Sequence, residues 1–147
     1  MIAVIDRPID IPEILASVKD RSAGAVDLFI GTTRDVSRGK KVKYLDYEAY
    51  GPMAQQQMEQ MAEEVLQKWK VSKISIVHRV GRVEIGEASV VIAVSSAHRR
   101  EAFEACRYLI DTLKRDIPIW KKEYFEDGAV WIGLEGSQPP GSKPRSD

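Results

Sequence analysis

Ser95 to Glu123 reads SSAHRREAFEACRYLIDTLKRDIPIWKKE, and this stretch decides how the rest of the chain is arranged. Apolar residues recur in it at spacings of three and four, which predicts an amphipathic helix with one face in the core. Ser95 or Ser96 would cap the start of this helix. Pro118 disfavours helical geometry in the residue before it, so the helix should end between Lys114 and Asp116. The residues of the predicted buried face are Ala102, Phe103, Cys106, Leu109, Ile110 and Leu113.

Cationic side chains stand at both ends of the predicted helix. Lys114 lies in its last turn, and Lys121 lies in the alternating segment Ile117 to Phe125, which is predicted to be a strand. A chain reversal between the two lysines would bring both ammonium groups to one pocket. His98 and Arg99 stand at the other end, about 24 Å away at ~1.5 Å per residue. A site that used both ends would need a second subunit or a folded-over loop.

Composition indicates one globular domain without a net charge, so any anion-binding site must come from a local cluster of basic residues. The chain has 147 residues, 44% of them hydrophobic, and 22 basic residues against 22 acidic ones. A neutral balance argues against a nucleic-acid or membrane surface partner. A single cysteine excludes an intramolecular disulfide and a cysteine-rich metal cage. Without a signal peptide or a long apolar span, we expect a cytoplasmic catalytic domain over 1–134 and a flexible tail, rich in Pro, Gly and Ser, over 135–147.

The order of expected elements, β-α-β-β-α-β-β-α-β-β, predicts an α+β fold with mostly antiparallel pairing and helices packed on the sheet. Lys73–Val80 and Ala88–Ser95 are the most apolar strands and should form the central pair. The helix that opens at Gly51-Pro52 should bury Met58, Met61, Ala62, Val65, Leu66 and Trp69. The other expected elements are strands at Ile2–Ile5, Gly24–Thr32, Val42–Tyr50 and Ala129–Leu134 and a helix from Asp10 to Lys19.

The residues carry no familiar hydrolytic or metal motif. No carboxylate pair, metal-spaced histidine cluster, Walker loop or Ser/His/Asp grouping is visible. Cys106 lies on the predicted buried stripe, where a neutral thiol is inert. His78 lies inside a predicted buried strand, where histidine is usually a hydrogen-bonded structural residue. What remains is a cationic set suited to an anionic substrate and to developing oxyanions: Arg34, His98, Arg99, Lys114, Lys121 and Lys122.

Phosphate binding is the chemistry that the sequence favours for part of this set. Arg34 comes just after a predicted strand, where rigid backbone aims a guanidinium that can bind phosphate with two hydrogen bonds. The alternative is that the whole segment from Arg34 to Lys41 is a solvated basic turn. His98 and Arg99 would add side-chain cations to the free N–H groups of a helix start, which is a natural phosphate site.

The lysines also have alternative interpretations. Lys114 could simply complement the helix dipole. Lys121 shares a strand face with Ile119, so its ammonium should be partly desolvated, which lowers a lysine pKa and makes the group a usable acid or base. Lys122 falls on the other face with Tyr124, and the sequence leaves open which face is the more buried.

Six motifs occur together: Phe29-Ile-Gly-Thr-Thr-Arg34, Val77-His-Arg-Val-Gly81, Ser95-Ser-Ala-His-Arg99, Phe103-Glu-Ala105, Leu113-Lys114 and Pro118-Ile-Trp-Lys-Lys-Glu123. Their combination, over about residues 2 to 134, resembles the large, catalytic subunit of molybdopterin synthase. The resemblance implies an α/β hammerhead fold and a homodimer at the core of a heterotetramer. Each large subunit would bind a small ubiquitin-like carrier whose C-terminal Gly-Gly bears a thiocarboxylate.

The implied reaction transfers two sulfurs from that carrier to cyclic pyranopterin monophosphate and forms the dithiolene of molybdopterin. Because the carrier brings the sulfur, the resemblance implies no metal, cofactor or catalytic cysteine. Carried over by position, Lys114 and Lys121 are the catalytic lysines, and Arg34, His98 and Arg99 bind the pterin phosphate. Flanking binding positions are implied at Thr32, Thr33, Lys122 and Glu123.

Two other functions compete with this one. The chain could be a non-catalytic module that binds a ubiquitin-like partner or a phosphorylated ligand, although two intact lysines argue against that. A nucleic-acid binder using the basic loop from Arg34 to Lys43 is disfavoured by the neutral charge and by the few aromatic residues in the loop.

Overall fold

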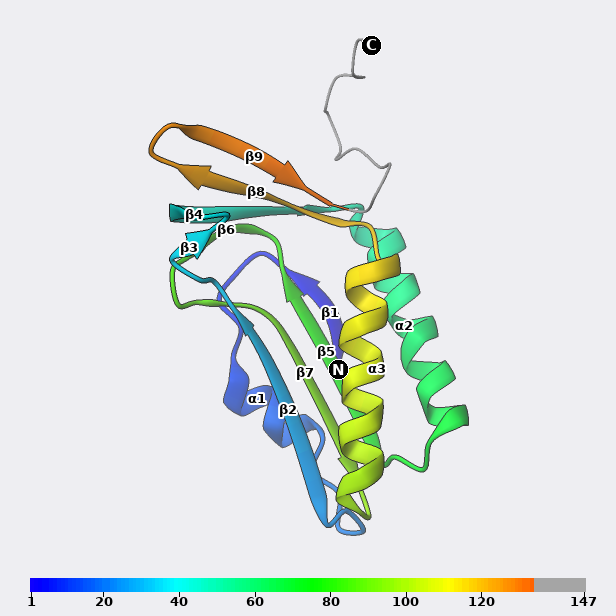
Figure 1. Ribbon diagram of the computed structural model, residues 1–147. Helices are drawn as coiled ribbons and strands as arrows, with labels where there is room; N and C mark the ends of the chain where they lie inside the picture. Colours follow the sequence, from blue (N-terminus) through cyan, green and yellow to red (C-terminus); the bar gives the residue numbers. More distant parts are fainter. Residues whose placement is uncertain (134–147) are drawn as a thin grey trace.

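A computed structural model describes residues 1–133, which form nine strands and three helices (Figure 1). This α+β arrangement confirms the predicted class. The predicted tail, 135–147, lies outside the described residues, as does Leu134 at the end of the last predicted strand. No helix among residues 1–133 is long and apolar enough to cross a membrane.

The first sheet has four strands in the order β1-β5-β7-β2. β1 pairs with β5 in parallel, and the other two pairings are antiparallel. β5 and β7 are the central pair, as their continuous apolar character predicted. The bounds are Ile2–Ile5 for β1, Ala25–Thr32 for β2, Lys73–Arg79 for β5 and Ala88–Ser96 for β7.

The second sheet lies across one end of the first (Figure 1). Its order is β3-β4-β8-β9, and β6 also pairs with β4. The antiparallel β4–β8 register sets Tyr47 opposite Lys121. The bounds are Val36–Ser37 for β3, Lys40–Ala49 for β4, Gly81–Glu84 for β6, Ile119–Phe125 for β8 and Gly128–Ile132 for β9.

Helices cover both faces of the first sheet, which divides the core into two parts. α2 (Gly51–Lys68) and α3 (Arg99–Asp116) pack on one face, and α1 (Ile11–Ser17) packs on the other (Figure 1). The larger cluster, under α2 and α3, includes Met58, Ile92 and Leu109 at 0% exposure. Burial of such side chains contributes roughly 25 cal/mol per Å² of apolar area, and the largest cluster of buried apolar residues lies on this face.

α3 starts two or three residues later than a cap at Ser96 or Ser95 would place it. Both Ser95 and Ser96 belong to β7, and His98 is the N-cap residue, without a side-chain capping hydrogen bond. The predicted serine cap is therefore wrong. Ser96 Oγ instead donates to the carbonyl of His98, and Ser95 Oγ accepts from the backbone N–H of Lys73, so both hydroxyls stabilise the strand end.

Two residues assigned to buried helix faces lie outside the core. Phe103 is 58% exposed, and Leu66 is 49% exposed. α3 buries Ala105 and Thr112 in addition to the rest of its predicted stripe, so the buried face is rotated away from Phe103. The end of α3 at Asp116 agrees with the prediction from Pro118, and the N–H of Ile117 still bonds to the carbonyl of Leu113.

Candidate active site

The two lysines meet at the corner where α3 turns into β8. Lys114 lies in the last turn of the helix, and Lys121 is the third residue of the strand. Both side chains line one cavity of about 230 Å³ under the second sheet, together with Tyr47, His78 and Ser89. The chain reversal around Pro118 therefore brings both lysines to one cavity, as the sequence predicted.

A second hollow of about 140 Å³ continues from this cavity and shares both lysines. It adds Arg34 and Thr32 from the end of β2 and Glu123 from β8. The two adjoining hollows, here called the trough, are thus lined by three cations and one carboxylate. Such a trough suits an extended anionic ligand whose charges are spread over more than one group.

Lys121 has a perturbed pKa. Its side chain is half-buried, and this burial lowers its pKa from the ordinary lysine value. The carboxylate of Glu123 partly opposes this shift, while the charges of Lys114, Arg34 and Arg38 add to it. The lowered pKa is the direction expected from the strand face, and it makes Lys121 a better proton donor near neutral pH.

Glu123 is a buried counter-charge at the floor of the trough. It is 3% exposed and accepts a hydrogen bond of 3.0 Å from Ser37 Oγ. Lys121 and Glu123 alternate with Lys122 along β8, so they share the face toward the trough. The carboxylate limits the repulsion between the cations, which would otherwise oppose folding of this corner.

Thr32 and Thr33, which precede Arg34, differ in their exposure and in what they contact. Thr32 is exposed and lines the second hollow. Thr33 is 4% exposed, and its backbone N–H donates to the carbonyl of Glu87. Its Oγ1 has no hydrogen-bond partner among the residues that the structure describes. Thr33 therefore supports the turn, while Thr32 and Arg34 face the trough.

Lys122 lies apart from the trough. Its Nζ stands 5.1 Å from the ring centre of Tyr124 and 5.5 Å from that of Trp131, on the outer face of the second sheet. These cation–π contacts hold the ammonium against aromatic rings rather than against Lys121. The sequence left open which face of β8 is the more buried. In the structure the face that carries Lys121 is the one toward the cavity.

His98 and Arg99 are exposed at the far end of α3 and do not line the trough within one chain. Their separation from Lys114 remains about 24 Å along the helix axis. Phosphate binding by these two residues therefore stays a prediction. A single copy does not unite all the residues that the resemblance assigns to one reaction.

Two cavity residues have no functional role in the sequence interpretation. Tyr47 lies on β4, opposite Lys121, and burial raises its pKa. His78 lies at the end of β5, and its ring meets that of Tyr47 edge-on with centres 5.1 Å apart. His78 belongs to the Val77-His-Arg-Val-Gly81 motif. Its position beside the lysines, however, follows only from the way in which the two sheets pack together.

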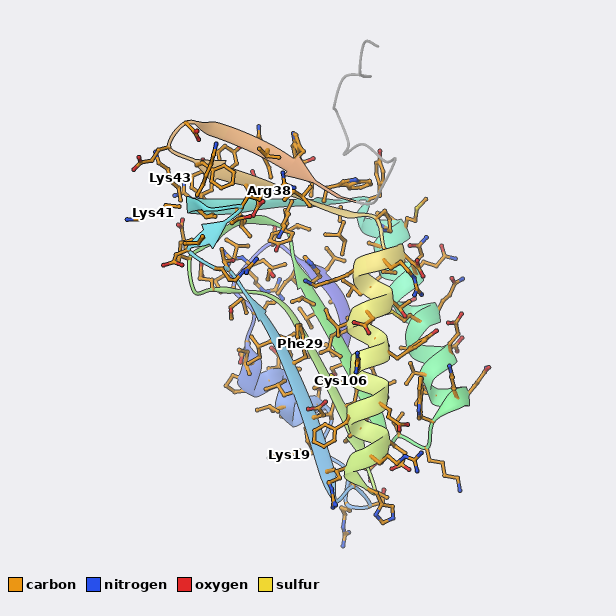
Figure 2. The ribbon with its side chains drawn as sticks, viewed as in Figure 1. Lys19, Phe29, Arg38, Lys41, Lys43 and Cys106 are labelled. Atoms are coloured by element: carbon orange, nitrogen blue, oxygen red, sulfur yellow. The ribbon has the colours of Figure 1, made fainter. Side chains whose placement is uncertain are left out.

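Cys106 has the inert environment that the sequence predicted. Burial, with a smaller contribution from Asp27, raises the pKa of its thiol to about 12. Figure 2 shows Cys106 midway along α3, away from the lysine corner. Within residues 1–133 no group of three or more His, Cys, Asp or Glu side chains could hold a metal ion.

Comparison with known proteins gives consistent matches. The model of the family described as "MoaE protein" matches residues 4–116. A Halalkalibacterium halodurans protein named molybdopterin synthase catalytic subunit is 42% identical over 147 aligned residues, covering 99% of this chain and 94% of the relative. A Bacillus subtilis protein of the same name is 49% identical, covering 93% and 88%. The crystal structure of molybdopterin synthase from Staphylococcus aureus superposes with a TM-score of 0.86 at 41% identity, covering 89% of this chain and 96% of that one.

Proposed function

The chain belongs to the MoaE protein family, and from that premise we propose that it is the catalytic subunit of a molybdopterin synthase. Two sulfurs pass from the thiocarboxylated C-terminus of a small ubiquitin-like carrier to cyclic pyranopterin monophosphate and form the molybdopterin dithiolene. The observation that carries the proposal is the cavity in which Lys114 and Lys121 meet, since it offers two ammonium groups to anionic reactants.

The charges of the trough match the charges of the reactants. A thiocarboxylate and a pterin phosphate are both anions, and attack on a carbonyl creates a further oxyanion. Lys114 and Lys121 stabilise that oxyanion, because preorganised donors in a partly buried site act strongly on developing charge. Lys121, with its lowered pKa, can also give up a proton to a leaving group. Arg34 holds the phosphate from the second hollow.

The remaining implied positions take supporting roles in this proposal. Thr32 binds beside Arg34, Thr33 holds the turn that aims both, and Glu123 orients the lysines through its charge. Lys122 lies on the outer face of the sheet, and we propose that it contacts the carrier rather than the pterin.

A second copy of the chain supplies His98 and Arg99 to the trough in this proposal. β2 is an edge strand of the first sheet among the described residues, and its Val26 and Ile30 are 47% and 37% exposed. An exposed apolar edge favours pairing with another strand. Two β2 strands paired antiparallel around a two-fold axis would place the Ala25 end of each copy beside the Thr32 end of the other.

That pairing would bring the two ends of the site together. Ala25 is in register with Ser96 at the end of β7, close in sequence to His98, whereas Thr32 lines the hollow with the lysines. The eight residues of β2 at about 3.4 Å each span a length similar to the helical separation. The proposed assembly is a homodimer core with one carrier bound to each subunit, and its proposed compartment is the cytoplasm, as for a biosynthetic enzyme.

Reconstitution from purified components tests the proposal. The chain is mixed with thiocarboxylated carrier and cyclic pyranopterin monophosphate, and dithiolene product is measured after oxidation to a fluorescent pterin. A carrier that ends in an ordinary carboxylate is the matched control and should give no product. Tight carrier binding without product from the thiocarboxylated form would instead support the non-catalytic binding module.

A further inference from the structure

His78 is a buried histidine that no step proposed above uses. It is 3% exposed at the end of β5, and it lines the same cavity as Lys114 and Lys121. Its register partners on the neighbouring strands are Val4 and Val90, both apolar. An apolar side chain would satisfy packing at this position without the cost of burying ring nitrogens. The presence of a histidine at this position is therefore to be explained by the hydrogen bonds that its imidazole can make.

The ring is held in one tautomer. Nδ1 lies 2.8 Å from the backbone carbonyl oxygen of Arg79. Because a carbonyl can only accept a hydrogen bond, Nδ1 carries the proton and Nε2 keeps a free lone pair. The edge-on contact with Tyr47, at an interplanar angle of 67°, further restricts rotation of the ring. His78 thus presents a fixed hydrogen-bond acceptor.

The ring is also neutral under ordinary conditions. Burial lowers the pKa of His78 to about 4, the hydrogen bond to Arg79 opposes this shift, and the charge of Lys114 adds to it. The ammonium of Lys114 is therefore within electrostatic reach of the ring. A neutral acceptor can bind a cation where a third positive charge would repel it.

We propose that His78 is a positioning residue for Lys114, with Nε2 accepting a hydrogen bond from the ammonium and aiming it into the cavity. Lys114 is exposed in the last turn of α3 and has a long side chain with many rotamers. Fixing such a side chain costs conformational entropy, which a hydrogen bond from a charged donor offsets. His78 acts before substrate arrives, so that the ammonium already stands where negative charge develops.

Nitrogen NMR of the imidazoles tests this contact without any activity. The chain contains only two histidines, His78 and His98, so a spectrum of protein labelled with ¹⁵N-histidine is simple to assign. At pH 7 we expect His78 to show a protonated Nδ1 and a bare Nε2, and Lys114→Ala should move the Nε2 signal toward that of a nitrogen without a donor. The matched control, Lys43→Ala, should leave it in place. A proton on Nε2, or an Nε2 signal unchanged by Lys114→Ala, would overturn the proposal.

Kinetics tests the consequence, and this part rests on the proposed sulfur transfer. His78→Phe keeps a buried ring without an acceptor, and His78→Gln returns an acceptor at similar reach. We expect His78→Phe to lower kcat about tenfold or more, as for the loss of a hydrogen bond to a charged group, and His78→Gln to recover most of it, with carrier affinity unchanged in both. In a Lys114→Ala background, His78→Phe should cause no further loss.

The outcomes separate the two proposals. If the wild-type chain makes no dithiolene, the proposed function fails while the NMR experiment still decides the role of His78. If the wild type is active and His78→Phe matches it, or if His78→Phe lowers kcat equally with and without Lys114, His78 is structural. If His78→Phe does not fold, the wild-type tautomer and the response to Lys114→Ala decide the question.

Discussion

Replacement of Lys121 by alanine separates catalysis from folding at the corner between α3 and β8. In the proposed reaction its ammonium stabilises the oxyanion that forms when the carrier carbonyl is attacked. Loss of one preorganised donor of this kind lowers kcat about 100- to 1000-fold, or about 3 to 4 kcal/mol in transition-state free energy. Lys114 remains in the cavity and keeps part of the stabilisation. We therefore expect a folded variant with kcat reduced by that factor and with carrier affinity nearly unchanged.

A second substitution, Lys121→Met, tests the effect of the buried charge on stability, which should rise when the charge is removed. Burial lowers the folded-state pKa of Lys121 below that of the unfolded chain. Below the folded pKa the lysine is charged in both states, so the folded state bears the full cost of burying the charge. That cost disappears as pH rises from the folded pKa to the unfolded value near 10.5. Lys121→Met should therefore raise the free energy of unfolding at pH 7, and the gain should vanish above pH ~10.5.

Single-turnover kinetics with saturating carrier and pterin is the appropriate assay, with urea unfolding measured on the same preparations. Lys43→Ala, which removes an exposed lysine from the same sheet, is the matched control. It should keep both kcat and stability. Near-normal turnover of Lys121→Ala would refute the catalytic assignment, and loss of carrier binding would make Lys121 an interface residue instead.

Three further substitutions have distinct expected outcomes. Lys114→Ala should also reduce kcat severely at unchanged carrier affinity, measured by single turnover and calorimetry; a change in affinity alone would contradict the assignment. Cys106→Ala should retain activity and lose roughly 1 kcal/mol of stability, as for a small buried side chain; inactivation of the folded variant, or a persulfide seen by mass spectrometry, would mean that the thiol carries sulfur. Lys122→Ala should raise the KM for the carrier and leave kcat intact, because its ammonium lies on the outer face of the sheet; a fall in kcat alone would place it in the chemistry.

Local sequence rules were sufficient for the elements on which the site depends. Pro118 determined where α3 ends, and the reversal after it brought Lys114 and Lys121 into one cavity. The apolar runs of β5 and β7 predicted the central pair of the first sheet. These predictions were correct because each feature is decided by a few neighbouring residues.

Features decided by contacts distant in sequence were missed. The serine caps failed because β7 continues through Ser96, whose hydroxyl donates to His98. β6 begins at Gly81, which has a φ of 87°, and it forms only because β4 offers an edge for pairing. His78 was interpreted as structural because nothing near it in sequence indicates that α3 delivers Lys114 to its side. Likewise, the sequence did not show where the ammonium of Lys122 lies, because its contact with Trp131 depends on the position of β9.

Subunit complementation tests most directly the claim that sulfur transfer occurs in a lysine trough completed by a second copy. A chain with His98→Ala and Arg99→Ala and a chain with Lys121→Ala are each expected to be inactive. After mixing and subunit exchange, verified by native mass spectrometry, heterodimers carry one intact composite site, and dithiolene formation should return to a fraction of the wild-type rate. A mixture that stays inactive although the subunits have exchanged, or a monomer that is fully active at assay concentration, would contradict the account.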